Sequence, residues 1–118
     1  MLPAFLVPET VIHANGEGAP LPLNGTRPDA LLVTLGITHV VEQESVLVSI
    51  QGSADGTTWE HVPLGIFPQK FYPSVSTIVL DMAEHARVSF LRAQWKVVRW
   101  GRGDKTPSFT LYVFVEPA

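Results

Sequence analysis

Apolar and polar residues alternate in several short stretches of the chain, as they do in strands that bury one face and expose the other. In residues 29–41, one face carries Leu31, Val33, Leu35, Ile37 and Val41. In residues 45–53, the inward face carries Val46, Val48 and Ile50. No stretch has the i, i+3, i+4, i+7 spacing of a long amphipathic helix. The pattern therefore predicts a protein built mainly of strands.

Prolines and glycines separate these stretches from further short apolar runs. Strands are also predicted at residues 9–14, 58–62, 77–82, 87–98 and 108–116, and one helical turn at residues 82–86. In residues 108–116 the second face carries Tyr112 and Phe114, which is compatible with a strand covered on both sides. Seven or eight short strands are typical of an antiparallel β-sandwich, jelly-roll or immunoglobulin-like. We therefore expect an all-β fold.

The segment from Ser53 to Thr57 has the chemistry of a tight turn between two strands. An aspartate carboxylate can accept hydrogen bonds from nearby backbone amides, and glycine adopts a positive φ without steric cost. Asp55 and Gly56 are therefore expected to form a hairpin turn. Trp59 follows directly, and we expect its ring to be a plug of the core, as we do for Trp95.

The length of 118 residues, of which 46% are hydrophobic and 16% charged, suits one domain with a single core. Residues 9–118 are predicted to form that domain, and residues 1–8 an extended N-terminal arm that lies across a neighbouring subunit. The apolar runs fall short of the roughly 20 residues of a membrane-spanning helix. The first residues lack the basic start of a signal peptide. We expect a soluble protein with no membrane partner.

The sequence contains no recognisable catalytic or metal-binding motif. It has no cysteine, which excludes disulfides, thiolate metal sites and cysteine nucleophiles. The histidines are too widely spaced for a common zinc motif: His13, His39, His61 and His85. No phosphate loop, nucleophile elbow or dinucleotide fingerprint occurs. The sequence therefore predicts a non-enzymatic protein with no catalytic residue, no cofactor and no metal.

Charge is distributed unevenly along a chain whose net charge is −3. Residues 1–86 contain two basic and nine acidic residues, a charge of −7, and residues 87–118 contain six basic and two acidic residues, a charge of +4. Opposite charges of this kind favour association between copies or with a shell through complementary potentials. The overall acidic excess opposes nucleic-acid binding.

Two loop segments carry the candidate surface contacts. The turn between the last two predicted strands contains Arg99, Trp100, Arg102 and Lys105. The proline-rich segment 63–73 contains Phe71 and Tyr72. Aromatic and arginine side chains are enriched at protein interfaces, and aromatic rings in the loops of sandwiches can also serve as platforms for sugars.

The stretch from Val46 to Trp59 resembles the Ser-x-Asp-Gly-x-x-Trp hairpin of many extracellular and viral β-sandwich modules, including discoidin-like carbohydrate-binding domains. The wider order of motifs adds to this: Leu32-Val33-Thr34-Leu35 before the hairpin, Phe90-Leu91-Arg92-Ala93-Gln94-Trp95 after it, and Thr106-Pro107-Ser108-Phe109-Thr110 at the last strand. That order is similar to small structural proteins encoded among the head and tail genes of tailed phages and prophages. The resemblance covers roughly residues 10–115 and implies a β-sandwich in a virion, without implying any functional residue.

Two hypotheses about function follow from these observations. The first is a virion structural protein, in particular a capsid decoration or head/tail accessory protein. It would be made in the host cytoplasm and bind capsid or tail proteins of the same particle, as a homo-oligomer or bound to the shell. The alternative is a carbohydrate-binding β-sandwich module that binds a surface glycan through Trp100, Phe71 and Tyr72.

Overall fold

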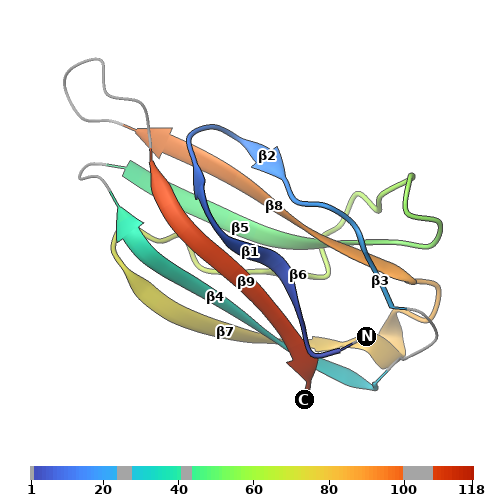
Figure 1. Ribbon diagram of the computed structural model, residues 1–118. Helices are drawn as coiled ribbons and strands as arrows, with labels where there is room; N and C mark the ends of the chain where they lie inside the picture. The colour runs from blue at the N-terminus through green and yellow to red at the C-terminus, as the bar shows by residue number, and fades with distance from the viewer. Residues whose placement is uncertain (1, 24–27, 41–43, 100–107) are drawn as a thin grey trace.

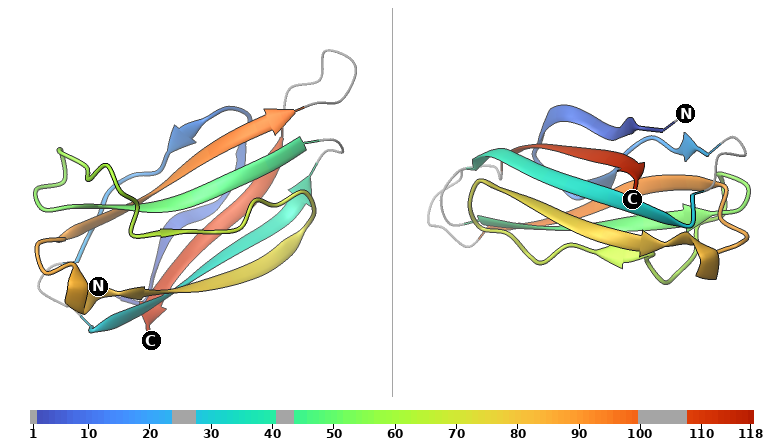
Figure 2. Two further views of the ribbon diagram at one scale, coloured as in Figure 1. Left: turned by 180° about the vertical axis from the view of Figure 1, so that it is seen from behind. Right: turned by 90° about the horizontal axis from the view of Figure 1, so that it is seen from below.

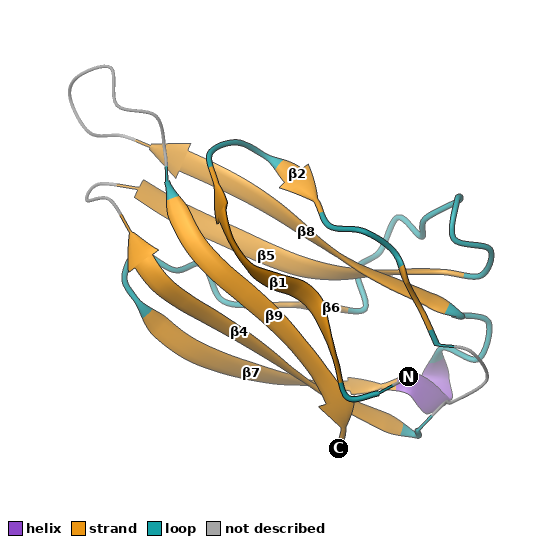
Figure 3. Ribbon diagram, viewed as in Figure 1, coloured by secondary structure: helices purple, strands orange, loops and turns teal. Residues whose placement is uncertain are grey.

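The computed structural model describes residues 2–23, 28–40, 44–99 and 108–118. These residues form nine strands and one short 3-10 helix, so the expected all-β fold is confirmed (Figure 3). The elements are β1 (Ala4–Ile12), β2 (Gly16–Glu17), β3 (Leu21–Pro22), β4 (Ala30–Val40), β5 (Glu44–Ser53), β6 (Gly65–Ile66), β7 (Ser74–Asp81), η1 (Met82–Glu84), β8 (Phe90–Arg99) and β9 (Phe109–Pro117).

The strands form two antiparallel sheets that pack face to face as a β-sandwich (Figures 1 and 2). One sheet, here called sheet A, has the order β1-β9-β4-β7. The other, sheet B, has the order β2-β8-β5-β6, and β3 also pairs with β8. Strands from both halves of the sequence therefore alternate within each sheet, and β8 and β9 lie inside the sheets rather than at their edges.

The alternating residues of the four long inner strands form the core between the sheets. Each fully buried aliphatic side chain contributes about 1.5–3 kcal/mol to the hydrophobic stabilisation. The fully buried set includes Leu31, Val33 and Leu35 of β4, Val46, Val48 and Ile50 of β5, Leu91 and Ala93 of β8, and Leu111, Val113 and Val115 of β9. The inward faces predicted for residues 29–40 and 45–53 are thus confirmed, and Val41 lies outside the described residues.

A buried carboxylate joins the two sheets at one end of the sandwich. Glu44, the first residue of β5, has no exposed surface, and both of its carboxylate oxygens lie 3.1 Å from the backbone nitrogen of Ser108. The N–H of Ser108 therefore donates to the side chain of Glu44 directly before β9 begins. This contact fixes where β9 enters sheet A relative to the start of β5.

The prediction that residues 1–8 form an arm separate from the domain is wrong. Strand β1 begins at Ala4 and pairs with β9 along sheet A. Leu6 and Val7 are each only 4% exposed, so removing this segment would expose apolar surface of the core. Pro8 is compatible with a strand here because β1 is at the edge of the sheet, where a missing N–H is tolerated.

The predicted turn at Asp55 and Gly56 is confirmed, but the strand predicted at residues 58–62 is absent. Gly56 has a φ of +83°, and within residues 58–62 the one β-bridge is that of Trp59 to Ser53. The chain still follows the edge of β5 irregularly, since Leu64 donates to the carbonyl of Ile50. Pro63, next to Leu64, has no N–H to donate to a regular ladder. The predicted hairpin is therefore a turn followed by a loop.

Replacing Gly56 with Val should lower the free energy of unfolding by about 1–3 kcal/mol, because a β-branched residue is strained at positive φ. A Cβ atom at this position would also lie 3.3 Å from the ring of Phe90. Chemical denaturation monitored by circular dichroism measures the change. Gly56→Asn, which tolerates positive φ better, is the control and should cost less. Equal stability of wild type and Gly56→Val would contradict this account of the turn.

Candidate functional site

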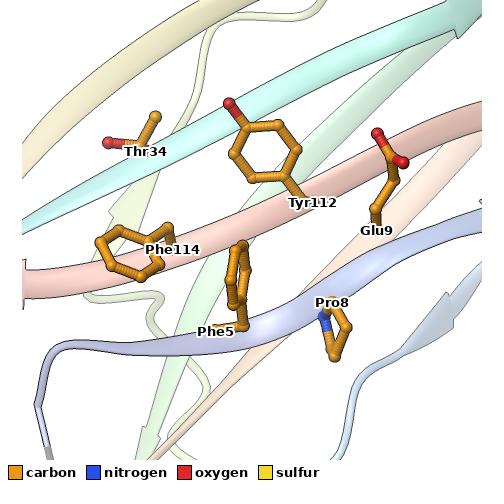
Figure 4. A pocket seen from close by; sticks show the side chains of 6 residues that line it. All are labelled: Phe5, Pro8, Glu9, Thr34, Tyr112 and Phe114. Atoms are coloured by element: carbon orange, nitrogen blue, oxygen red, sulfur yellow. The ribbon is translucent and has the colours of Figure 1, made fainter.

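The outer face of sheet A carries a cluster of partly exposed aromatic rings. Phe5 of β1 pairs with Phe114 of β9, and the centre of its ring lies 5.0 Å from that of Phe114 and 6.0 Å from that of Tyr112. Both contacts are edge-to-face, which is a favoured geometry for aromatic pairs. Phe5 is 52% exposed. The three rings, seen in Figure 4, therefore present apolar surface to the outside of the sandwich.

Glycine at position 36 allows one of these rings to lie against the sheet. Gly36 of β4 is directly opposite Tyr112 of β9. A Cβ atom added at Gly36 would overlap the far end of the Tyr112 ring, so any larger residue would push the ring away. The ring therefore covers the backbone of β4, and the shape of the outer face depends on this glycine.

Apolar side chains are exposed again at the far edge of the same sheet. Val75 and Val79 of β7 are 69% and 64% exposed, and they lie opposite Gly36 and Leu32 of β4. We name the surface formed by Phe5, Tyr112, Phe114, Val75 and Val79 the aromatic face. It includes a shallow hollow of about 540 Å³, lined by Phe5, Pro8, Glu9, Thr34, Tyr112 and Phe114 (Figure 4). Glu9 is the one carboxylate in this lining.

Trp59 is not a plug of the core, contrary to the prediction from the sequence. Its ring is half-buried, and the guanidinium carbon of Arg92 lies 4.3 Å from the ring centre. Arg92 belongs to the outer face of sheet B, where its Nε donates to Oε1 of Gln51 at 2.7 Å. The loop after Gly56 holds Trp59 on this outer face, where a cation–π contact stabilises it. Phe67, just after β6, is instead the aromatic residue of this region that is fully buried.

Trp95 is neither fully buried in the core nor fully exposed on the surface. It shares the inward side of β8 with Leu91 and Ala93 and packs against the core while remaining half-buried. Its indole nitrogen donates to the carbonyl of Ala14 at 3.1 Å. The expected packing of this tryptophan is therefore confirmed in part.

A second hollow, of about 500 Å³, lies beside Trp59 and is lined by more ionisable side chains. It is lined by Ala54, Asp55, Thr58, Trp59, Glu60, His61 and Arg87. The lining thus combines one aromatic ring with carboxylates, an imidazole and a guanidinium. We name it the Trp59 groove.

Asp55 in this groove is committed to its own turn. Its Oδ1 accepts hydrogen bonds from the backbone N–H groups of Thr58 at 2.8 Å and Thr57 at 2.9 Å, and from the hydroxyl of Ser53 at 3.1 Å. These bonds, those to the backbone first, hold the pKa of Asp55 well below its usual range. A carboxylate that stays ionised in this way is a poor general acid near neutral pH.

The structure places only part of the sequence-predicted contact set. Phe71 and Tyr72 are 51% and 56% exposed, and Nζ of Lys70 lies 5.8 Å from the ring centre of Tyr72. Arg99 is the last residue of β8 and pairs with Glu44. Trp100, Arg102 and Lys105 lie outside the described residues.

Backbone pairing puts Lys70 and Arg99, one residue from each predicted contact segment, near the same end of β5. Lys70, next to Phe71, pairs with Val46 on β5, and Glu44, two residues earlier on β5, pairs with Arg99. The acidic and basic halves of the sequence are not two halves of the molecule, however. Strands β8 and β9, which carry the late residues, are paired on both sides with earlier strands.

Sequence reasoning missed the aromatic face as a site. The signal was present in residues 108–116, whose second face carries Tyr112 and Phe114, but that pattern also fits a strand covered on both sides. Phe5 was assigned to an arm, which hid its contact with Phe114. The pairing of β1 with β9 brings these rings together across more than a hundred residues of sequence.

Comparisons with known proteins identified no family for this chain. A scan against protein-family models found no match, and a search of curated protein sequences found none.

Among the described residues, no group of three His, Asp or Glu side chains could hold a metal ion. None of the helical residues in the described part of the chain forms a segment long and apolar enough to cross a membrane.

The pKa of Asp55 leads to a prediction about acid stability. Because its pKa is lower in the folded than in the unfolded chain, its charge stabilises the fold above the unfolded pKa of about 4, and this contribution is lost as the pH falls. The melting temperature of wild type should therefore exceed that of Asp55→Asn at neutral pH, and the gap should narrow below about pH 4. Thermal melts from neutral to acid pH measure it. A gap independent of pH would show that the charge of Asp55 does not stabilise the turn.

Proposed function

We propose that this protein is a non-enzymatic structural component of a virion, a capsid decoration or head/tail accessory protein, and that it docks on another protein of the particle through its aromatic face. The observation that carries the proposal is the set of apolar residues on the outer face of sheet A, which are exposed at both of its edges, at Phe5 on β1 and at Val75 and Val79 on β7. An apolar surface of this kind, with a polar rim, marks an interaction site on a protein surface.

The form of the aromatic face favours a protein partner over a small molecule. Pockets for small molecules enclose most of their ligand, whereas the hollow at Phe5 and Tyr112 opens onto a broad sheet surface. Protein interfaces are enriched in Phe and Tyr at their centre, and an edge-to-face pair such as Phe5 and Phe114 presents rigid apolar surface at a low cost in conformational entropy. The resemblance of the strand order to phage head and tail proteins supports a virion as the setting.

The docking surface can be tested with two matched exposed valines. Val79 lies on the aromatic face and Val62 lies in the loop after Trp59, and they are 64% and 75% exposed. Particles that lack the protein, made by deleting its gene, are incubated with purified wild type, Val79→Lys or Val62→Lys, and the bound protein is measured by sedimentation. Val79→Lys should weaken binding at least about tenfold, because it buries a lysine charge in an apolar interface. Val62→Lys should bind like wild type.

Two results would contradict this proposal. Absence of the protein from mature particles, determined by mass spectrometry of purified virions, would exclude a structural role in the virion. Equal binding of Val79→Lys and wild type to depleted particles would exclude the aromatic face as the docking surface.

The Trp59 groove favours a second candidate function, the binding of a glycan. Sugars bind by stacking on an aromatic ring while polar side chains accept and donate hydrogen bonds to their hydroxyl groups. The half-buried ring of Trp59 is surrounded by Glu60, His61 and Arg87, which together offer both acceptors and donors. This groove differs from the loop platform of Phe71 and Tyr72 inferred from the sequence.

Glycan-array binding distinguishes the two aromatic sites. If the groove binds a glycan, Trp59→Ala should reduce binding at least about tenfold, whereas Phe71→Ala should leave it unchanged. Circular dichroism melts of both variants control for folding, since the half-buried Trp59 ring also packs on Arg92. No binding of wild type to any glycan on the array would reject this candidate.

A further inference from the structure

The two edges of sheet A differ in how well they are protected against pairing with another strand. The β1 edge contains Pro8, and its register with β9 is irregular between Phe5 and Val7 and again between Val7 and Thr10. Prolines and irregularities of this kind block the addition of a further strand. The β7 edge has neither feature: its pairing with β4 is regular over eight residues, and the stretch from Ser74 to Leu80 has no proline and no charged residue.

Strand β7 has one side free of backbone pairing among the described residues. It pairs with β4 alone, and the remaining backbone hydrogen bonds of the described chain involve no residue of β7. In Figure 1 it forms the border of sheet A on the side away from β1. The neighbouring β6 pairs with β5 in the other sheet and not with β7. A row of backbone N–H and C=O groups on a strand of eight residues is therefore available to a partner strand.

We propose that the partner of this edge is a second copy of the chain, whose β7 pairs with it in the antiparallel direction about a two-fold axis. The sequence of β7 complements itself in this arrangement. With Thr77 opposite Thr77 at the axis, Val75 of each copy lies opposite Val79 of the other on the outer face. Cross-strand pairs of threonines and of β-branched residues stabilise antiparallel strands, and no like charges meet within the stretch from Ser74 to Leu80.

The biological role of this pairing rests on the proposed function, because the dimer would present the docking surface of both copies together. Two four-stranded sheets become one continuous sheet of eight strands, and Val75 and Val79 of both copies meet at its centre. The two aromatic faces then form one surface with two-fold symmetry. A dimer of this form would dock on a particle protein with twice the area of a single copy.

The register is tested by introducing single cysteines into a chain that has none. Thr77→Cys places the two new thiols opposite each other at the axis, within the range for a disulfide, so mild oxidation should give a covalent dimer. Val75→Cys alone should not, because its two copies would be about 14 Å apart along the strands. Mixing Val75→Cys with Val79→Cys should restore the cross-link. Thr10→Cys, an exposed threonine on the β1 edge, is the control and should stay monomeric on denaturing gels.

A charge test measures the same contact without covalent chemistry. Analytical ultracentrifugation of wild type should show a dimer. The dissociation constant of the Thr77→Lys dimer should be at least about tenfold higher than that of wild type, because two lysines would face each other. An equimolar mixture of Thr77→Lys and Thr77→Glu should dimerise again. A wild type that stays monomeric at every concentration, or a dimer unaffected by Thr77→Lys and not cross-linked by Thr77→Cys, would overturn the proposal. Monomers that still bind depleted particles through the aromatic face would leave the proposed function intact and reject the β7 pairing alone.

Discussion

Strand β9 is held in register by two neighbours, β1 and β4, and the character of both faces of sheet A follows from this. Leu111, Val113 and Val115 must point into the core because both neighbouring strands are fixed in register with them. A slip of one residue would turn these side chains outward and bring Tyr112 and Phe114 inward, since the side chains of a strand alternate between its faces. The hydrogen bond from Ser108 to the buried carboxylate of Glu44 fixes the start of the strand. The aromatic face is therefore a direct consequence of how β9 is held.

The two outer faces of the sandwich have different chemistry, and this difference suggests different roles. The outer face of sheet A carries the aromatic face, with Tyr112 lying over Gly36. The outer face of sheet B carries polar side chains, among them Arg92 and Gln51, which are hydrogen-bonded to each other. Exposed apolar side chains order the water around them, so covering them with another protein surface would be favourable. The polar face can remain in water.

The aromatic face and the free edge of β7 belong to the same sheet, so the two proposals describe one continuous surface. Val75 and Val79 take part in both, because their side chains lie on the face while their backbone forms the edge. The β1 edge on the opposite side is protected by Pro8 and an irregular register. Pairing through β7 would extend the sheet in one direction only, which favours a closed dimer over an open chain of subunits.

Local patterns in the sequence determined the strand class, most of the long strands and the turn at Asp55 and Gly56, because alternation and turn chemistry act between residues that are close in the chain. They did not determine the environment of Trp59, which depends on Arg92 of a strand far along the sequence. They also did not determine whether Tyr112 and Phe114 would be covered, because a second apolar face on a strand looks the same with or without a layer above it. Only the pairing of β1 with β9 and of β4 with β7 placed Phe5, Val75 and Val79 beside these rings. The order of strands in a sheet is set by contacts between distant segments, and these contacts leave no periodic trace in the sequence of either segment.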